Sequence, residues 1–178
     1  MEANISKILI TEEEIKVKVK ELGEMITRDY QEKDLLVICI LKGAMVFMAD
    51  LVREIKVPLD IDTMVVTSYG SSTKSSGVVR ILKDLDESVE DRDLLIVEDI
   101  VDTGLTLKYL MDNIFSRGPR SVKICSFLDK PERRKVAITP DYKGYSIPDE
   151  FVVGYGLDYA EKYRNLPYVA VLDPKAYS

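Results

Sequence analysis

The sequence predicts an α/β domain with a central, mostly parallel sheet flanked by helices, and three observations lead to this prediction. Residues 35–41 (LLVICIL) and residues 94–97 (LLIV) are continuous apolar runs, typical of strands buried on both faces. Amphipathic segments with helical spacing of apolar residues alternate with such runs. The chain of 178 residues is long enough for one domain whose core needs no disulfide or structural metal.

The first expected helix begins at Thr11. Thr11 and Glu14 have the spacing of a capping box, in which each side chain bonds the backbone N–H of the other. Apolar residues then recur at intervals of three and four and are expected to form the buried face of the helix: Ile15, Val19, Leu22 and Ile26.

The remaining elements follow in alternation. We expect further helices over residues 44–55 and 103–115, and strands over residues 35–41, 61–67, 78–82, 94–97, 121–128, 151–153 and 168–172. Residues 68–77 (SYGSSTKSSG) are rich in Ser and Gly and predict a flexible loop. Because neither an internal repeat nor a long linker divides the chain, residues 1–178 are interpreted as a single domain.

Three polar breaks follow predicted strands. They are Lys42-Gly43, residues 98–106, and Asp129-Lys130. In parallel sheets, ligands bind beyond the carboxyl ends of the strands. We therefore expect all three breaks to lie on one rim of the sheet and to form the binding site.

Composition excludes several classes of function. The 25 basic and 31 acidic residues give a net charge of −6, which argues against a general nucleic-acid binder. The chain has no histidine, so any general acid or base is a carboxylate, Lys, Tyr or Cys. Hydrolases with a Ser-His or Cys-His pair and His-ligated zinc enzymes are thereby excluded.

The two cysteines and the chain ends bear on location. Cys39 and Cys125 lie in apolar runs and are expected to be buried, reduced thiols. The first twenty residues mix charges throughout and show no signal-peptide pattern, and no run approaches the roughly 18 apolar residues that span a bilayer. We therefore expect a cytoplasmic protein without a membrane partner.

The segment VEDIVDTGLTL (residues 97–107) combines features of an anion site with acidic residues. A strand, a tight loop with Thr103 and Thr106, and a helix N-terminus would present backbone N–H groups and hydroxyls to a phosphate. The loop is neither a Walker loop nor a dinucleotide-binding loop. Glu98 and Asp99 can accept hydrogen bonds from vicinal hydroxyls or ligate Mg²⁺, so the segment predicts a ribose 5-phosphate site.

Two other interpretations of this segment remain open on the residues alone. The acids could form a solvated strand end with Asp102 as a helix N-cap. The Asp-Thr-Gly tripeptide also occurs in aspartic proteases, but those need two such loops, and that interpretation leaves Glu98 and Asp99 unexplained.

Residues 97–107 resemble the phosphoribosyl-pyrophosphate loop of the type I phosphoribosyltransferases. The rest of the chain resembles one branch, the hypoxanthine-guanine phosphoribosyltransferases, over nearly its whole length. The matching segments are LKGA (41–44), SYGSSTKSSG (68–77), LDKPERR (128–134) and IPDEFVVGYGLDYAEKYRNLP (147–167). The resemblance implies the type I phosphoribosyltransferase fold, with a small hood built from terminal segments over the sheet.

The resemblance also implies an activity. The family transfers the 5-phosphoribosyl group from phosphoribosyl pyrophosphate to hypoxanthine or guanine, giving IMP or GMP and pyrophosphate with Mg²⁺. It implies a homodimer or homotetramer, and the net charge of −6 argues against a nucleic-acid partner. Two alternatives are kept: a phosphoribosyltransferase that prefers xanthine, and a non-catalytic regulator that senses phosphoribosyl pyrophosphate.

Carried over by position, the resemblance implies roles around the ribose and the phosphates. Glu98 and Asp99 would hold the ribose hydroxyls beside Mg²⁺, and Asp102 would be the general base at the purine. The 5′-phosphate would bind Asp102, Thr103, Gly104, Leu105 and Thr106. Pyrophosphate would bind Lys42, Gly43 and Arg164, and in the family the peptide matching Leu41-Lys42 is cis. On the residues alone, Lys42-Gly43 is a helix-start turn and Arg164 a surface arginine.

The resemblance assigns the purine site and the lid as well. Lys130 would donate to the 6-oxo group, Phe151 would stack on the ring, Val152 would contact it through its backbone, and Asp158 would ligate Mg²⁺ with its carbonyl facing the purine. Ser68 and Tyr69 would begin a loop that closes over the site. On the residues alone, Lys130 is a solvated turn residue, residues 151–153 are strand core, and residues 68–77 are a disordered connector.

Overall fold

The computed structural model describes residues 4–68 and 79–176 of the chain. A six-stranded sheet has the order β4-β3-β2-β5-β6-β7, and a three-stranded sheet has the order β1-β9-β8. The strands are β1 (Ile5–Ile10), β2 (Leu35–Leu41), β3 (Leu59–Ser68), β4 (Val79–Lys83), β5 (Asp93–Val101), β6 (Ser121–Asp129), β7 (Tyr142–Ser146), β8 (Val152–Val153) and β9 (Val169–Leu172). The helices are α1 (Glu12–Asp29), α2 (Met45–Glu54) and α3 (Leu105–Phe115), with short 3₁₀ turns at Pro131–Arg133 and Pro174–Ala176.

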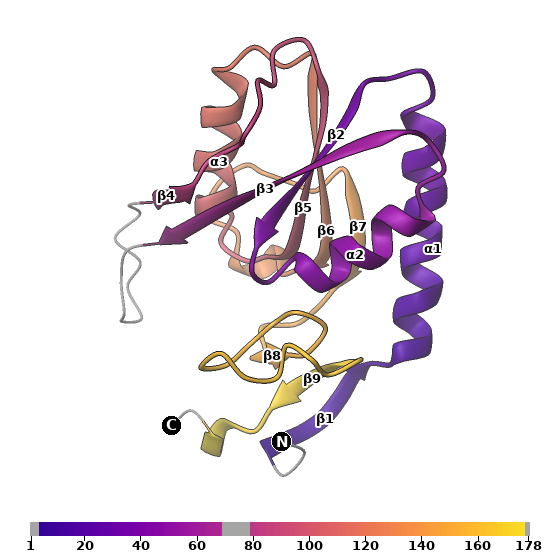
Figure 1. The fold of residues 1–178 in the computed structure, drawn as a ribbon. Helices are drawn as coiled ribbons and strands as arrows, with labels where there is room; N and C mark the ends of the chain where they lie inside the picture. The colour runs from indigo at the N-terminus through magenta and orange to yellow at the C-terminus, as the bar shows by residue number, and fades with distance from the viewer. Residues whose placement is uncertain (1–3, 69–78, 177–178) are drawn as a thin grey trace.

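The larger sheet is parallel apart from its edge. Strands β3, β2, β5, β6 and β7 pair in parallel, and β4 joins β3 in antiparallel fashion. One apolar cluster packs α1 and α2 against one face of this sheet, and a second packs α3 against the other face. This confirms the expected mostly parallel sheet with helices on both faces (Figure 1).

Helix α1 forms as the sequence predicts. Thr11 is its N-cap, and both hydrogen bonds of the capping box with Glu14 are present. The four residues expected on its inner face are all buried: Ile15, Val19, Leu22 and Ile26. No helix in the described parts of the chain is both long and apolar enough to cross a membrane.

The smaller sheet is a hood made from segments near the two ends of the chain. Strand β9 pairs antiparallel with both β1 and β8. Figure 1 shows this hood lying beyond the carboxyl ends of the parallel strands, next to both termini. The hood therefore faces the rim on which the three polar breaks were expected.

The structure corrects several sequence predictions. Strands β1 and β7 were not predicted, and β5 continues to Val101 rather than ending at residue 97, so Glu98 and Asp99 lie within the strand. Helix α3 begins at Leu105 instead of residue 103, after Gly104 at φ 81°. Ser68 ends β3, while Tyr69 and the rest of the expected loop lie outside the described residues.

Candidate active site

The three polar breaks do meet on one rim. In the parallel register, Cys39 of β2 pairs with Val97 of β5, and Val101 of β5 pairs with Asp129 of β6. Lys42, the end of β5 and Lys130 therefore leave three adjacent strands at the same edge of the sheet. The hood supplies a fourth side with residues 147–167.

The loop after β5 forms a small polar hollow at the start of α3. Gly104 adopts a left-handed conformation, and Leu105 N–H bonds to Thr103 Oγ1 at 3.4 Å. The first N–H groups of a helix have no acceptor within it, so they can bind an anion. A cavity of about 100 Å³ lies here, lined by Glu98, Ile100, Val101, Asp102, Thr103, Gly104, Thr106 and Leu107.

Asp102 does not cap α3. The N-cap residue is Gly104, which makes no side-chain capping bond. The Asp102 carboxylate instead accepts a hydrogen bond from Arg133 Nε at 2.5 Å through Oδ1. The N-cap interpretation of Asp102 is therefore wrong, and Asp102 is one of the residues that line the hollow.

Glu98 and Asp99 are an acidic pair with strongly perturbed ionisation. Glu98 is only 9% exposed, and burial, reinforced by the charge of Asp99, raises its pKa well above the usual value. Burial also raises the pKa of Asp99 to about 6, a rise opposed by the hydrogen bond from Ile100 N–H at 2.7 Å. A buried carboxylate and a partly buried one at consecutive positions of β5 favour a ligand that brings positive charge or hydroxyl donors.

The turn after β2 packs directly on this acidic pair. The Leu41-Lys42 peptide is cis, as the family resemblance implied. A Cβ on Gly43 would lie 1.8 Å from Asp99 Oδ2, so any other residue there would force the Asp99 carboxylate to shift. Gly156 of the hood packs equally closely, because a Cβ there would lie 2.1 Å from the Gly43 carbonyl oxygen. Three distant segments thus meet at Gly43.

Lys42 and Arg164 form one charged cluster with two hood acids. Lys42 Nζ lies 3.0 Å from Glu161 Oε2, and Arg164 Nη2 lies 2.9 Å from Asp158 Oδ1 and 3.5 Å from Glu161 Oε1. Arg164 Nη1 also donates to the Gly156 carbonyl at 2.8 Å. Arg164 is therefore fixed at the rim and is no free surface arginine.

Lys130 is held against the segment that precedes β8. It is only 8% exposed, and its Nζ donates to the Glu150 carbonyl at 2.7 Å and lies 3.5 Å from Asp149 Oδ1. This corrects the interpretation of Lys130 as a solvated turn residue. The ammonium has three donors, so it can serve a further acceptor.

Phe151 and Val152 differ in exposure. Phe151 is 40% exposed and meets Tyr159 edge-on at 5.7 Å between ring centroids, whereas Val152 is buried in strand β8. The interpretation of residues 151–153 as plain strand core is therefore wrong for Phe151, which is exposed.

A family model decides the classification. The model for the phosphoribosyl transferase domain matches residues 7–160. The chain belongs to the phosphoribosyl transferase family.

Relatives of this phosphoribosyl transferase cover its full length. It is 57% identical over 177 residues to the hypoxanthine-guanine phosphoribosyltransferase of Bacillus subtilis, covering 99% of this chain and 98% of that protein. It is 55% identical over 178 residues to the enzyme of that name from Streptococcus pyogenes, covering 100% and 99%. A crystal structure of a hypoxanthine phosphoribosyltransferase from Staphylococcus aureus matches with a TM-score of 0.97 and 51% identity, covering 100% of this chain and 97% of that one.

The donor chemistry of the phosphoribosyl transferase rim fits magnesium that is shared with a ligand. Among residues 4–68 and 79–176, no group of three or more His, Cys, Asp or Glu side chains could hold a metal ion by itself. Mg²⁺ is usually bound through one or two carboxylates together with substrate phosphates and water. Glu98 and Asp99 provide such carboxylates, and Asp158 lies near enough to raise the pKa of Asp99.

The structure also reveals two contacts at the phosphoribosyl transferase rim that sequence analysis missed. Arg133 reaches both Asp102 and Asp149, although neither Arg133 nor Asp149 was singled out from the sequence. The only available signal was their presence in the matched segments LDKPERR and IPDEFVV. A charge run of this kind does not show which of its members faces the site.

Proposed function

We propose that this rim transfers the 5-phosphoribosyl group from phosphoribosyl pyrophosphate to hypoxanthine or guanine, giving IMP or GMP and pyrophosphate. The observation that carries the proposal is the meeting of an anion hollow, an acidic pair and a buried lysine on one rim. These match the three parts of the product: a phosphate, a ribose and a 6-oxopurine.

The residues divide the work by their chemistry. The loop from Asp102 to Thr106 would bind the 5′-phosphate through N–H groups and hydroxyls, while Glu98 and Asp99 accept hydrogen bonds from the ribose hydroxyls. Lys42, Gly43 and Arg164 would bind pyrophosphate. On binding, Lys42 would leave its ion pair with Glu161, and Arg164 its ion pair with Asp158, to contact the pyrophosphate. Mg²⁺ held by Glu98, Asp99 and Asp158 together with the ligand would neutralise phosphate charge.

The reaction is a displacement at C1′ of the ribose. The bond from C1′ to the pyrophosphate oxygen breaks, and the electron pair of that bond leaves with pyrophosphate. Purine N9 forms the new bond to C1′ with its own electron pair. Asp102 accepts the proton that the purine releases, from N7. General-base assistance of this kind accelerates reactions by about 10²–10⁴-fold.

The purine would be read by Lys130 and the hood. Lys130 donates to a 6-oxo group but cannot accept from the 6-amino group of adenine, because an ammonium has donors only. Phe151 would stack on the ring, and Val152 and Asp158 would contact it through backbone groups. Residues from Ser68 and Tyr69 onward would close over the site and exclude water from the cation-like C1′.

We further infer a cytoplasmic location and assembly as a homodimer or homotetramer. Two buried free thiols, Cys39 and Cys125, support the reducing compartment. The family resemblance supports the assembly. Light scattering on the purified protein would give its mass in solution, and a monomer at working concentration would contradict the assembly.

Four parallel assays test the function. Purified protein with Mg²⁺ and phosphoribosyl pyrophosphate receives hypoxanthine, guanine, xanthine or adenine, and nucleotide formation is followed by absorbance. We expect turnover of hypoxanthine and guanine and none of adenine. Preferential use of xanthine would change the substrate assignment. Folded protein that binds phosphoribosyl pyrophosphate but uses no base would instead be a sensor.

A further inference from the structure

Arg133 bridges two carboxylates that come from distant parts of the chain. Its Nε donates to Asp102 Oδ1 at 2.5 Å, and its Nη1 lies 3.3 and 3.2 Å from the two carboxylate oxygens of Asp149. Asp102 follows β5 in the larger sheet, whereas Asp149 precedes β8 in the hood. One guanidinium therefore connects the proposed general base to the hood.

The backbone around Arg133 is fastened to the loop that carries Asp102. Lys130 N–H donates to the Val101 carbonyl at 2.9 Å, and Lys135 N–H donates to the Thr103 carbonyl at 2.9 Å. These two bonds lie on either side of Asp102 along the loop. The 3₁₀ turn from Pro131 to Arg133 lies between their donors and places the guanidinium over the Asp102 side chain.

This contact leaves one oxygen of the carboxylate for the substrate. Arg133 occupies Asp102 Oδ1, and Oδ2 receives no hydrogen bond from the described residues. A carboxylate held at one oxygen cannot rotate freely, so its second oxygen keeps one direction. We propose that Arg133 is a positioning residue that fixes Asp102 Oδ2 as the acceptor of the purine proton, an inference that rests on the proposed function.

The bridge also supports the recognition of the purine by Lys130. Lys130 and Arg133 share Asp149, at 3.5 Å and 3.2 Å. Because Arg133 also pairs with Asp149, the Lys130 ammonium does not have to direct all its donors to that carboxylate. Its ammonium keeps a donor for the 6-oxo group while it also donates to the Glu150 carbonyl.

Loss of Arg133 acts on Asp102 through its orientation rather than through charge. The charge interaction is weak, because both side chains are more than 40% exposed and such pairs are well screened. Loss of orientation has the larger effect on the rate, since a misplaced reacting group can cost about 10²-fold. Removal of Arg133 therefore slows the reaction.

A double-mutant cycle tests the proposal. We expect Arg133→Gln to lower kcat for hypoxanthine about 10- to 100-fold while KM for phosphoribosyl pyrophosphate stays within about twofold. Arg133→Lys keeps the positive charge but lacks the planar guanidinium with its paired N–H donors. It should therefore recover only part of the kcat that Arg133→Gln loses. In the Asp102→Asn background, Arg133→Gln should lower kcat by less than about a further twofold, because the carboxylate that Arg133 positions is already absent.

Controls separate this outcome from loss of folding. Arg53→Gln removes an arginine that pairs with Asp50 on α2 and is 73% exposed, and kcat should not change. Thermal unfolding of all variants shows whether each is folded at assay temperature. A kcat for Arg133→Gln within twofold of the parent, or an undiminished loss in the Asp102→Asn background, overturns the proposal. An inactive parent enzyme would instead overturn the proposed function.

Discussion

The carboxylate of Asp102 is the group whose chemistry the proposed mechanism uses most directly. Replacing it with an amide in Asp102→Asn keeps the shape but removes the proton acceptor. We expect kcat with hypoxanthine or guanine to fall about 10²–10⁴-fold, the usual contribution of general-base catalysis. Binding of phosphoribosyl pyrophosphate, measured by titration calorimetry with Mg²⁺, should remain within a few-fold, because in the proposed site backbone amides hold the phosphate.

The same substitution on α3 supplies the control. Asp112 is exposed and pairs with Lys108 one helical turn away, so Asp112→Asn should leave kcat unchanged. Unaltered turnover by Asp102→Asn would remove Asp102 from the general-base role and leave the remainder of the site assignment intact.

Gly43 is the residue whose close packing bears most directly on Asp99. In Gly43→Ala, the new methyl group would overlap Asp99 Oδ2, while the other carboxylate oxygen, Oδ1, accepts the hydrogen bond from Ile100 N–H. The Asp99 carboxylate must then move away from the proposed ribose position. We expect kcat/KM for phosphoribosyl pyrophosphate to fall at least about tenfold in steady-state assays, since small displacements of site groups are costly.

Gly118, which lies far from the rim, provides a control for the general effect of replacing a glycine with alanine. Gly118 follows α3, and a Cβ there would meet only Glu90 Cγ at 3.8 Å. Its φ of 75° makes Gly118→Ala cost about 1 kcal/mol of stability. Its kcat/KM should nevertheless match that of the parent. Equal activity of both alanine variants would show that Asp99 tolerates displacement.

At the scale of residues, sequence analysis could name candidate site residues where they lie together in one local motif. Glu98, Asp99 and the loop to Thr106 are contiguous, so their chemistry could be inferred from one segment. Arg133 is separated from Asp102 by 31 positions and lies beside another arginine and several charged neighbours. Which of these cations meets Asp102 depends on the 3₁₀ turn and the sheet register, neither of which has a local sequence signature.

At the scale of elements, the buried parallel strands were predictable and the edges were not. Strand β1 is half exposed and pairs with β9 from the other end of the chain, a contact that no local pattern encodes. Strand β7 (YKGYS) is a short edge strand with a glycine. Strand β5 continues past its apolar run because β6 pairs with it as far as Asp129, so tertiary pairing overrides the polarity of Glu98 and Asp99.

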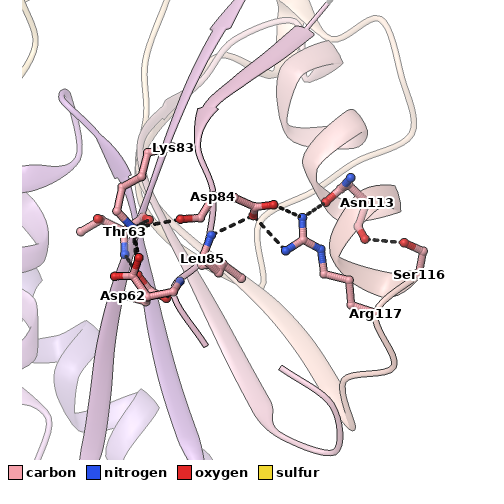
Figure 2. A network of polar contacts seen from close by, with 9 residues as sticks. Asp62, Thr63, Lys83, Asp84, Leu85, Asn113, Ser116 and Arg117 are labelled. Carbon is pink, nitrogen blue, oxygen red and sulfur yellow. Dashed lines mark hydrogen bonds and ion pairs between the residues drawn. The ribbon is translucent and has the colours of Figure 1, made fainter. Parts of the chain in front are cut away.

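A polar network links strand β3 to the end of β4 and the residues that follow it (Figure 2). Asp62 accepts hydrogen bonds from the N–H groups of Thr63 and Asp86 at 2.6 and 2.8 Å, and from Lys83 at 3.3 Å. Burial alone would raise the pKa of Asp62, but these bonds outweigh it and lower the pKa below its usual value. We expect Asp62→Asn to lower the free energy of unfolding by about 1–3 kcal/mol at pH 7.

The loss should depend on pH in a defined direction. Because the folded-state pKa of Asp62 is lowered, its stabilisation is complete above the unfolded value of about 4 and disappears as the pH falls through the folded value. Urea unfolding of parent and Asp62→Asn should therefore differ at pH 7 and converge below about pH 4. Asp86→Asn, at an exposed partner of Lys83, should change stability little at either pH. A difference that persists undiminished at pH 3 would refute the assignment.

At the scale of the molecule, the hood and the larger sheet share one core. The cluster under α1 and α2 contains hood residues Val152, Tyr155 and Val169 together with Phe47 and Phe127. The ring of Tyr155 lies 4.9 Å from that of Phe127 and 6.4 Å from that of Phe47, and its hydroxyl donates to Asp50 at 2.8 Å. The hood, which would carry the proposed purine site, is therefore anchored in the core of the sheet that would carry the proposed phosphate site.

This shared core predicts that the hood and the sheet unfold together. Val169 in the hood is fully buried, and Val169→Ala should cost about 1–3 kcal/mol. Cys39 and Cys125 report on the distant sheet, because both are buried and burial raises the pKa of Cys39 to about 12 and that of Cys125 further. Their reaction with a thiol reagent therefore requires opening of the sheet.

If the domain is one cooperative unit, Val169→Ala will accelerate the labelling of both thiols. The labelling rate should rise about tenfold for each 1.4 kcal/mol by which the substitution lowers the free energy of unfolding. Urea unfolding followed by circular dichroism supplies that loss independently. Ile8→Ala, at an exposed position on β1, should alter neither quantity. Thiol labelling that stays at the parental rate while Val169→Ala shows an early transition in urea would mean that the hood opens alone. The purine site could then come apart while the phosphate site stayed folded, and residues 1–178 would form two units.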